Sequence, residues 1–283
     1  MPAQIIITDN NIEAKETSRE IELLPLSQKD FQKYIPGKRI APCKLKLRIR
    51  CTQSTELLLV FRALRDQKIA LLVELCAGVN LVLQTACSGN KNAAHYLVTA
   101  FKLEENSELV LKSANCWKTA KATDYYYFWL SNAKLILQSR SYIWQAEHTE
   151  HYYLYLDHSF AQLRFSEVCI AGKAKISAKY LLKDKVSLQA NAKLAAFKAN
   201  IRNYSLVLAE GKENRAFTSC EEILLGKAKI LTVPALRSAD PSNELHHEAR
   251  IGKIKKEELQ YLLARGYSPA AAARLLLLRA AKF

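Results

Sequence analysis

The densest group of side chains that could bind a metal or transfer a proton lies in one short tract, Glu147–His151, which reads EHTEH. On a helix, two histidines at this spacing would share a face and form a metal site with the carboxylates between them. The residues that follow, Tyr152–Leu156 (YYLYL), instead favour a β-strand. On a strand His148 and His151 point to opposite faces, which favours a structural or surface role over a ligand role. One face of that strand would carry His148, Glu150, Tyr152, Leu154, Leu156 and His158.

The seven cysteines include no CxxC pair and no zinc-finger spacing with histidine, so a closed structural zinc site is disfavoured. Their low density and odd number fit free thiols in a reducing compartment. The aromatic tract Tyr125–Trp129 (YYYFW) could stack on bases or sugars. Alternating aromatic residues in a strand more often form core on one face and a cover on the other.

Basic residues exceed acidic ones by a wide margin, with a formal net charge of +15. Much of this excess lies in residues 171–229, where twelve Lys and Arg side chains stand against five Asp and Glu. The lysines alternate with inward-facing residues, so we expect them on a solvated outer face. Such a stripe could attract nucleic acid, deter aggregation of sheet edges or dock an acidic partner. Because no binding motif accompanies it, nucleic acid is the less favoured partner.

The chain has 283 residues, of which 49% are hydrophobic and 24% charged. These are values of an ordinary globular protein and exclude a disordered or collagen-like chain. The first residues lack the features of a secretory signal, and the longest apolar stretch, Leu71–Leu83, contains a glutamate. We therefore expect a cytoplasmic protein without a membrane segment.

The elements that must position these side chains follow a period of two. In Cys43–Cys51 (CKLKLRIRC) every odd position is apolar and every even one is basic, which predicts a strand with Cys43 and Cys51 on its buried face. Similar runs recur for almost two hundred residues without a helix-length segment between them, which disfavours a doubly wound α/β fold. Glycine and proline together number only 15, fewer than tight sandwich hairpins require. Stacked coils of roughly 20–25 residues fit better.

The C-terminal residues change to a helical period. Lys255–Arg265 places leucines on one face, and Gly266 stands where a helix C-terminus favours glycine. Ser268 can cap a second helix that starts at Pro269 and runs through Ala270–Ala281. The sequence therefore predicts a helical hairpin.

Three regions result. Residues 1–40 form an N-terminal segment that we expect to be partly helical, with a short helix over Glu13–Glu22 and another starting at Ser27–Asp30. Residues 41–240 form the β core, and residues 241–283 the C-terminal helical segment.

Four motifs in this order resemble the SufB and SufD proteins. They are Phe217–Gly226 (FTSCEEILLG), Thr232–Arg237 (TVPALR), Asn243–Ile254 (NELHHEARIGKI) and Glu258–Ser268 (ELQYLLARGYS). The resemblance implies a right-handed parallel β-helix flanked by helices, acting as a scaffold of the SUF iron–sulfur assembly machinery. In that family SufC, an ABC-type ATPase, binds the C-terminal helices, and SufB and SufD pair through their β-helices.

The resemblance also implies the residues of a cluster-assembly site. Cys220 matches the cysteine of the SufB motif, His247 matches a family histidine, and Glu248 matches the glutamate that SufD tends to replace with glycine. Thiolate, imidazole and carboxylate are sensible ligands for iron or a nascent cluster. The alternative for Cys220 is a core thiol at the end of a coil. Leu245 replaces a cysteine typical of SufD.

By the same resemblance, the C-terminal hairpin would dock the ATPase. Four consecutive leucines, Leu275–Leu278, cannot all face one core, which fits an exposed docking surface. The alternative is that they plug the end of the β-helix. The residues expected to contact the partner are Leu259, Tyr261, Leu262, Arg265 and Leu277.

The leading hypothesis is a short SufB/SufD-like scaffold that builds or transfers a transient iron–sulfur cluster and is not itself an enzyme. The sequence has no P-loop, so ATP hydrolysis would come from the SufC-like partner. The alternatives are a β-helical carbohydrate-active enzyme that uses Glu147–His158, and a basic nucleic-acid-binding module. Left open are a homodimer or a heterodimer with a SufB/SufD paralogue, the cluster type, the sulfur donor protein and the use of flavin. Cys220 together with Glu248 favours the SufB type.

Overall fold

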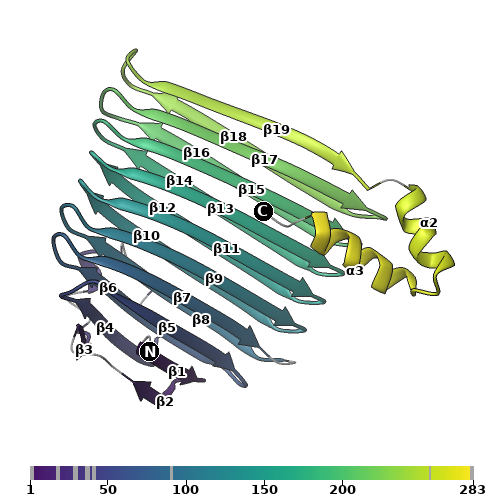
Figure 1. Ribbon diagram of the computed structural model, residues 1–283, viewed down its shortest axis with the longest axis horizontal. Coiled ribbons are helices and arrows are strands. Elements are labelled where there is room, and N and C mark those ends of the chain that lie inside the picture. Colours follow the sequence, from purple (N-terminus) through teal and green to yellow (C-terminus); the bar gives the residue numbers. More distant parts are fainter. Residues whose placement is uncertain are drawn as a thin grey trace.

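The computed structural model describes residues 3–16, 20–27, 31–35, 39, 43–89, 92–254 and 256–280. It shows a parallel β-solenoid of about 8 turns, followed by two helices (Figure 1). From β4 onward, successive strands alternate between two sheets, so each turn of the solenoid adds one strand to each sheet. The prediction of a mainly β, parallel β-helical fold with C-terminal helices is confirmed.

Two sheets make up the solenoid, and all neighbouring strands pair in parallel except β2 with β1 and β3 with β4. The strands of sheet A, in spatial order, are β19 (Glu244–Lys253), β17 (Arg215–Leu225), β15 (Ser187–Phe197), β13 (Phe160–Ile170), β11 (Lys134–Trp144), β9 (Glu108–Lys118), β7 (Asn80–Gly89), β5 (Thr55–Ala63), β1 (Ala3–Thr8) and β2 (Asn11–Glu16). Those of sheet B are β18 (Lys229–Ser238), β16 (Asn200–Ala209), β14 (Lys173–Leu182), β12 (Glu147–Asp157), β10 (Lys121–Ser131), β8 (Ala94–Leu103), β6 (Gln67–Leu75), β4 (Leu45–Cys51) and β3 (Ile21–Pro25).

The coils are longer than the sequence suggested. Glu147 pairs with Lys173 at a separation of 26 residues, and Lys121 pairs with Glu147 at the same separation. The expected 20–25 residues is therefore wrong, because the strands of these coils run for 11 and 10 residues and a corner joins each pair. This spacing decides which side chains meet inside the solenoid.

The corners between strands have backbone conformations that often require glycine, but here other residues adopt them. At most of them one residue takes a positive φ, which L-residues adopt as isolated positions at a modest cost. His158, with φ of 46°, is one of these corner residues and lies apart from the buried row formed by His148 and Glu150. The non-glycine corner residues from β8 to β17 are Asn106, Thr119, Asn132, Gln145, His158, Ala171, Lys185, Lys198 and Glu213.

The aromatic tract of β10 has a structural role, as its alternation suggested. Tyr126 and Phe128 point inward and are buried. On the outer face, Trp129 stacks on Tyr155 of the next coil, with ring centroids 3.8 Å apart. Tyr125 and Tyr127 likewise stack on His151 and Tyr153.

The helix expected over Glu13–Glu22 is wrong, because β2 and β3 occupy this region. The strand β1 extends sheet A by pairing in parallel with β5, and β2 folds back against β1. Tertiary pairing of this kind outweighs weak local helix propensity. The second helix was expected to start at Ser27–Asp30. Residues 28–30 of this segment lie outside the described residues.

The helical hairpin is confirmed as α2 (Lys256–Ala264) and α3 (Pro269–Ala280). Gly266 has φ of 85°, and the N–H of Tyr267 donates to the carbonyl oxygen of Leu262 at 3.2 Å. Ser268 Oγ accepts the N–H of Ala271 at 3.3 Å and so caps α3. No helix in the described ranges has the length and apolarity needed to cross a membrane.

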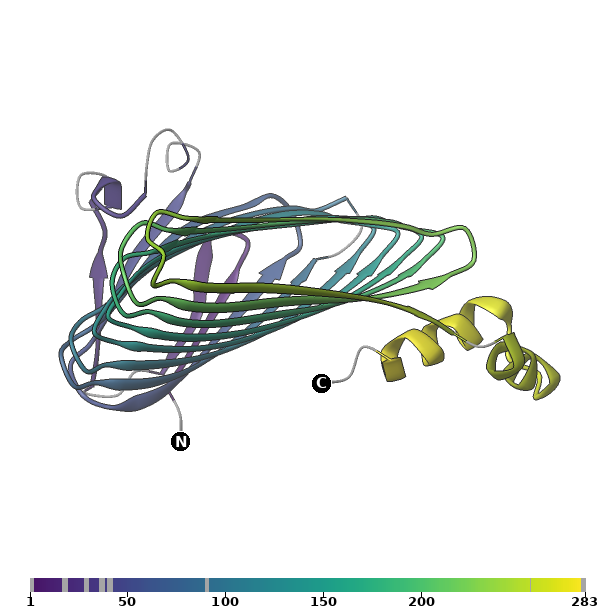
Figure 2. The ribbon, with the colours of Figure 1, turned by 90° about the horizontal axis from the view of Figure 1, so that it is seen from above.

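The two terminal regions cover opposite outer faces of the solenoid. Phe31 and Ile35 pack on sheet B, where they contact a cluster that includes Tyr127. The helix α3 packs on sheet A, and Figure 2 shows both helices on the side away from residues 31–35.

Gly211 lies at a corner where the chain passes close to the preceding coil. A Cβ at this position would overlap the carbonyl oxygen of Lys183 and Asp184 Oδ1. We expect Gly211→Ala to lower the free energy of unfolding by about 1–3 kcal/mol, since backbone must shift to make room. Gly252→Ala is the matched control, because its Cβ would meet the nearest atom only at 3.6 Å. Equal urea midpoints for the two variants would contradict this prediction.

Candidate functional site

Cys220 lies on the inner face of β17, near the C-terminal end of the solenoid. It is 3% exposed. Its Sγ lies 3.6 Å from Asn203 Nδ2 and 3.5 Å from Thr232 Oγ1, both on sheet B. Burial raises the pKa of the thiol, although these two polar neighbours oppose the shift. In this state Cys220 is a protonated, sheltered thiol that could become a ligand if the coil opened.

His247 lies on the neighbouring strand β19, on the same face as Cys220. It pairs in register with Thr218, and its Nδ1 lies 2.9 Å from Thr218 Oγ1. The buried Nε2 has no hydrogen-bond partner within the described part of the chain. Burial also lowers the pKa of His247, which favours the neutral imidazole that metals bind.

Glu248 follows His247 in the strand and therefore points to the opposite face. It pairs in register with Ser219, and its Oε1 accepts hydrogen bonds from Arg250 at 2.7 and 2.8 Å. A cavity of about 20 Å³ between the sheets is lined by Cys220 and His247, and a depression of about 200 Å³ by Cys220 and Glu248. The structure thus groups Cys220 with His247 and separates Glu248 from them by the thickness of the sheet.

The strands β19 and β18, which lie beside this site, are the C-terminal edge strands of sheets A and B. Within the described residues, β19 pairs only with β17 and β18 only with β16. Large apolar side chains are exposed here: Leu231 (51%), Val233 (42%), Leu236 (37%) and Ile251 (71%). Unpaired edges with exposed apolar residues are typical of surfaces that another chain covers.

The expected partner-binding residues fall into two groups. Tyr261 on α2 is 57% exposed, and the guanidinium of Arg265, the residue after α2, lies 5.0 Å from its ring centroid, so the two form one exposed surface. Leu259 and Leu262 on α2 are half-buried. Leu277 is fully buried, because it packs into a cluster on the outer face of sheet A. It holds α3 in place and is not available for docking in this state.

The four leucines do not plug the end of the solenoid. Leu276 and Leu277 are buried, whereas Leu275 is 44% exposed. The cluster around Leu277 contains Val168, Ile170, Ala195 and Ile223, which lie on sheet A strands.

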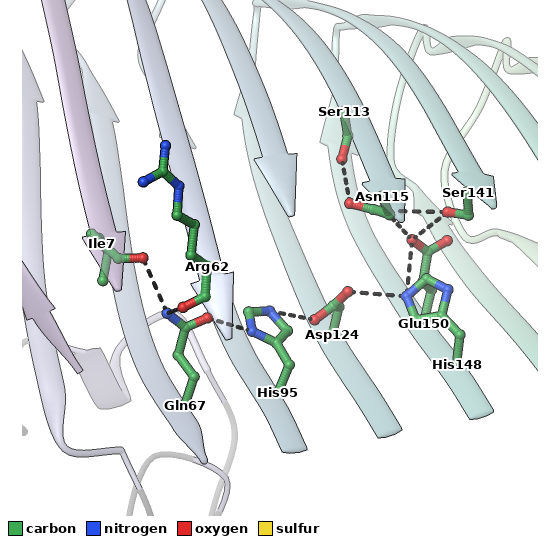
Figure 3. A network of polar contacts seen from close by, with 10 residues as sticks. All are labelled: Ile7, Arg62, Gln67, His95, Ser113, Asn115, Asp124, Ser141, His148 and Glu150. Carbon is green, nitrogen blue, oxygen red and sulfur yellow. Dashed lines mark hydrogen bonds and ion pairs between the residues drawn. The ribbon is translucent and has the colours of Figure 1, made fainter. Parts of the chain in front are cut away.

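A buried polar network inside the solenoid escaped the sequence analysis (Figure 3). Gln67 Nε2 donates to two backbone carbonyls, and its Oε1 lies 2.6 Å from His95 Nδ1. His95 Nε2 then lies 3.2 Å from Asp124, whose other oxygen lies 3.1 Å from His148 Nε2. His148 Nε2 is also 3.6 Å from Glu150 Oε1. The sequence feature that could have revealed this network is the length of one coil. That length separates Asp124 from Glu150, and the two residues pair in register on neighbouring coils.

This burial argues against a carbohydrate-active enzyme that uses His148 and Glu150. His148 and Glu150 are at most 2% exposed, so they cannot face a polysaccharide. The basic side chains of residues 171–229 lie on outer faces as expected, and Lys173, Lys175, Arg202 and Lys229 line one shallow groove. Charge alone does not specify a nucleic-acid site.

Comparison with known proteins agrees with the fold and with the C-terminal motifs. Residues 64–280 match the family described as "SUF system FeS cluster assembly, SufBD core domain". An iron–sulfur cluster assembly SufBD family protein of Pyrococcus horikoshii is 46% identical over 71 residues, which cover 25% of this chain and 16% of that protein. A second protein of that description from the same organism is 30% identical over 92 residues, 28% of each chain. One from Archaeoglobus fulgidus is 33% identical over 63 residues, 22% of this chain and 17% of that protein.

The alignments with these relatives thus span less than a third of their length, whereas the family match spans most of this chain. That match includes nearly the whole solenoid together with α2 and α3. The chain belongs to the SufBD family, whose core domain serves iron–sulfur cluster assembly in the SUF system.

Proposed function

We propose that this chain is a scaffold on which a nascent iron–sulfur cluster is built or from which it is transferred, together with a SufC-like ABC ATPase. The observation that carries this proposal is the position of Cys220 and His247 on the same face of the last two strands of sheet A, where both line one small cavity. A thiolate and a neutral imidazole can bind iron, and a thiolate can also carry sulfur from a donor protein.

The site is closed in this structure, so cluster assembly needs an opening step. The Cys220 thiol is buried, and Glu248 lies on the other side of the sheet. Strain on β18 and β19 would expose Cys220 and His247 and let Glu248 approach them. These are the last strands of their sheets, and each is held by one neighbouring strand, so they cost least to displace.

The ATPase partner supplies this strain in our proposal. The exposed surface of Tyr261 and Arg265 is its docking site, and α3 connects that site to the solenoid. Because Leu277 anchors α3 on β13, β15 and β17, a movement of the hairpin would act on the strand that carries Cys220.

A second copy of this chain or a paralogue would cover the open end. Leu231, Val233 and Leu236 on β18 and Ile251 on β19 supply its apolar contacts. Such pairing would bury the edges that flank Cys220 and place the assembly site at the interface. The reducing cytoplasm suits this chemistry, since all seven cysteines are free thiols.

The test is capture of the tagged full-length chain from its native cell extract under anaerobic conditions. We expect an ABC-type ATPase, identified by mass spectrometry, to co-purify with it. Tyr261→Glu should reduce the recovered ATPase at least tenfold, because it removes the exposed ring and places a charge on the docking surface.

Leu64→Glu is the matched control, because Leu64 is 54% exposed but lies at the corner between β5 and β6. It should leave capture unchanged. Full recovery of the ATPase with Tyr261→Glu would refute this docking surface. If the unaltered chain captures no ABC-type ATPase, the proposed partnership itself fails.

A further inference from the structure

Three carboxylates are buried in the middle of the solenoid with too little positive charge around them. Asp124, Glu150 and Glu167 are each at most 2% exposed. Their ion-pair partners are two imidazoles, His95 and His148. No lysine or arginine in the described ranges forms an ion pair with any of them. Since unpaired buried charges are costly, the cluster needs protons or a cation to neutralise it.

The geometry around His148 matches that of a metal site. His148 Nε2 lies 3.1 Å from Asp124 Oδ2 and 3.6 Å from Glu150 Oε1. All three ligand atoms lie within 4.8 Å of one another. Ligands bound at 2.0–2.2 Å around a tetrahedral ion are roughly 3.2–3.6 Å apart. The separation from Glu150 lies within this range and that from Asp124 lies just below it, so small side-chain shifts would bring the three atoms around one ion.

The surrounding side chains hold these ligands in place. His148 Nδ1 faces Glu167 Oε1 at 3.7 Å, and neither atom has a hydrogen-bond partner in the described structure although both are buried. Asn115 Nδ2 donates to Glu150 Oε1 at 3.0 Å, and Ser141 Oγ lies 3.4 Å from the same oxygen. A carboxylate behind the outer nitrogen of a ligating histidine is a common feature of metal sites, because it orients the ring.

We propose that Asp124, His148 and Glu150 bind one divalent first-row transition-metal ion inside the solenoid. Two carboxylates and a neutral imidazole balance the charge of such an ion, and this donor set suits zinc and ferrous iron. The site uses no cysteine and lies on β10 and β12, away from Cys220 on β17. The proposed metal site can therefore be tested independently of the scaffold function.

Cobalt(II) is the probe, because its visible spectrum distinguishes nitrogen and oxygen ligands from thiolates. The site is enclosed, so we expect the ion to enter as the chain folds. The full-length chain is therefore expressed with added cobalt, desalted and analysed for bound metal. We expect about one cobalt ion per chain, with the visible d–d bands of tetrahedral cobalt(II) and no thiolate charge-transfer band. We also expect the cobalt-loaded chain to melt at a higher temperature than the metal-free chain.

His148→Gln and Glu150→Gln should each lower cobalt retention at least tenfold, and Glu167→Gln should cause a smaller loss. His158→Gln is the matched control, because this exposed corner residue has φ of 46° and Gln145 occupies a similar corner with φ of 50°. Circular dichroism identifies the folded variants. If the folded unaltered chain holds no cobalt, or if folded His148→Gln and Glu150→Gln hold as much, the proposal is wrong. If both variants fail to fold, the unaltered chain tests the proposal. A thiolate charge-transfer band, or a melting temperature that cobalt does not raise, would then contradict it.

Discussion

Cys220→Ala is expected to abolish cluster formation on this chain while leaving its fold intact. After anaerobic incubation with ferric iron, sulfide and a thiol reductant, the unaltered chain should acquire bound iron and acid-labile sulfide together with cluster absorption. The variant should retain at most a tenth of this amount, because it lacks the thiolate that ligates the cluster iron. Its melting temperature should change little, since alanine removes only one small buried group.

Cys116→Ala is the control for this experiment. Cys116 is an exposed free thiol on β9 and lies outside the Cys220 site. It reports adventitious iron on accessible cysteines, which Cys220→Ala alone would not reveal. Loss of the cluster in Cys116→Ala, with retention in Cys220→Ala, would move the assembly site to β9 and overturn the role of Cys220.

Trp117→Ala is expected to cause the largest loss of stability. Trp117 is fully buried on β9 between the sheets, and its ring centroid lies 4.9 Å from that of His95 and 5.8 Å from that of His148. The ring also packs directly on the backbone of Gly89. Its removal leaves a cavity beside the buried polar network. We expect the free energy of unfolding to fall by about 3–5 kcal/mol, measured by urea denaturation.

Trp144→Ala provides the comparison. Trp144 is half-buried on the outer face of β11, where the Arg274 guanidinium lies 5.9 Å from its ring centroid. Its truncation creates no enclosed cavity, so we expect a loss of about 1 kcal/mol. Equal losses of unfolding free energy in the two variants would mean that the interior around Trp117 is loosely packed, and would contradict this prediction.

Much of the candidate site could be predicted because it depends on local pattern and motif. The period of two identified the strands, and their alternation correctly placed His148 and His151 on opposite faces. The spacing around Gly266 and Ser268 predicted the helical hairpin and its turn. The motifs around Cys220 and His247 indicate the family from the sequence alone.

The predictions that were wrong have one physical cause. Each concerns a feature that depends on contacts between residues far apart in sequence. The helix expected over Glu13–Glu22 is wrong because β1 finds a partner in β5. Leu277 looked like part of a docking surface because the sequence does not show which face of α3 meets sheet A.

By itself, then, the sequence determined the class of fold, the helical hairpin and the family, and it supplied the residues of the proposed cluster site. Only the tertiary structure decided the coil length, and with it the meeting of His95, Asp124, His148 and Glu150 inside the solenoid. It also placed Glu248 on the opposite face of the sheet from Cys220 and His247. Alternation within a strand is a property of the backbone, whereas register between coils depends on the lengths of strands and corners together.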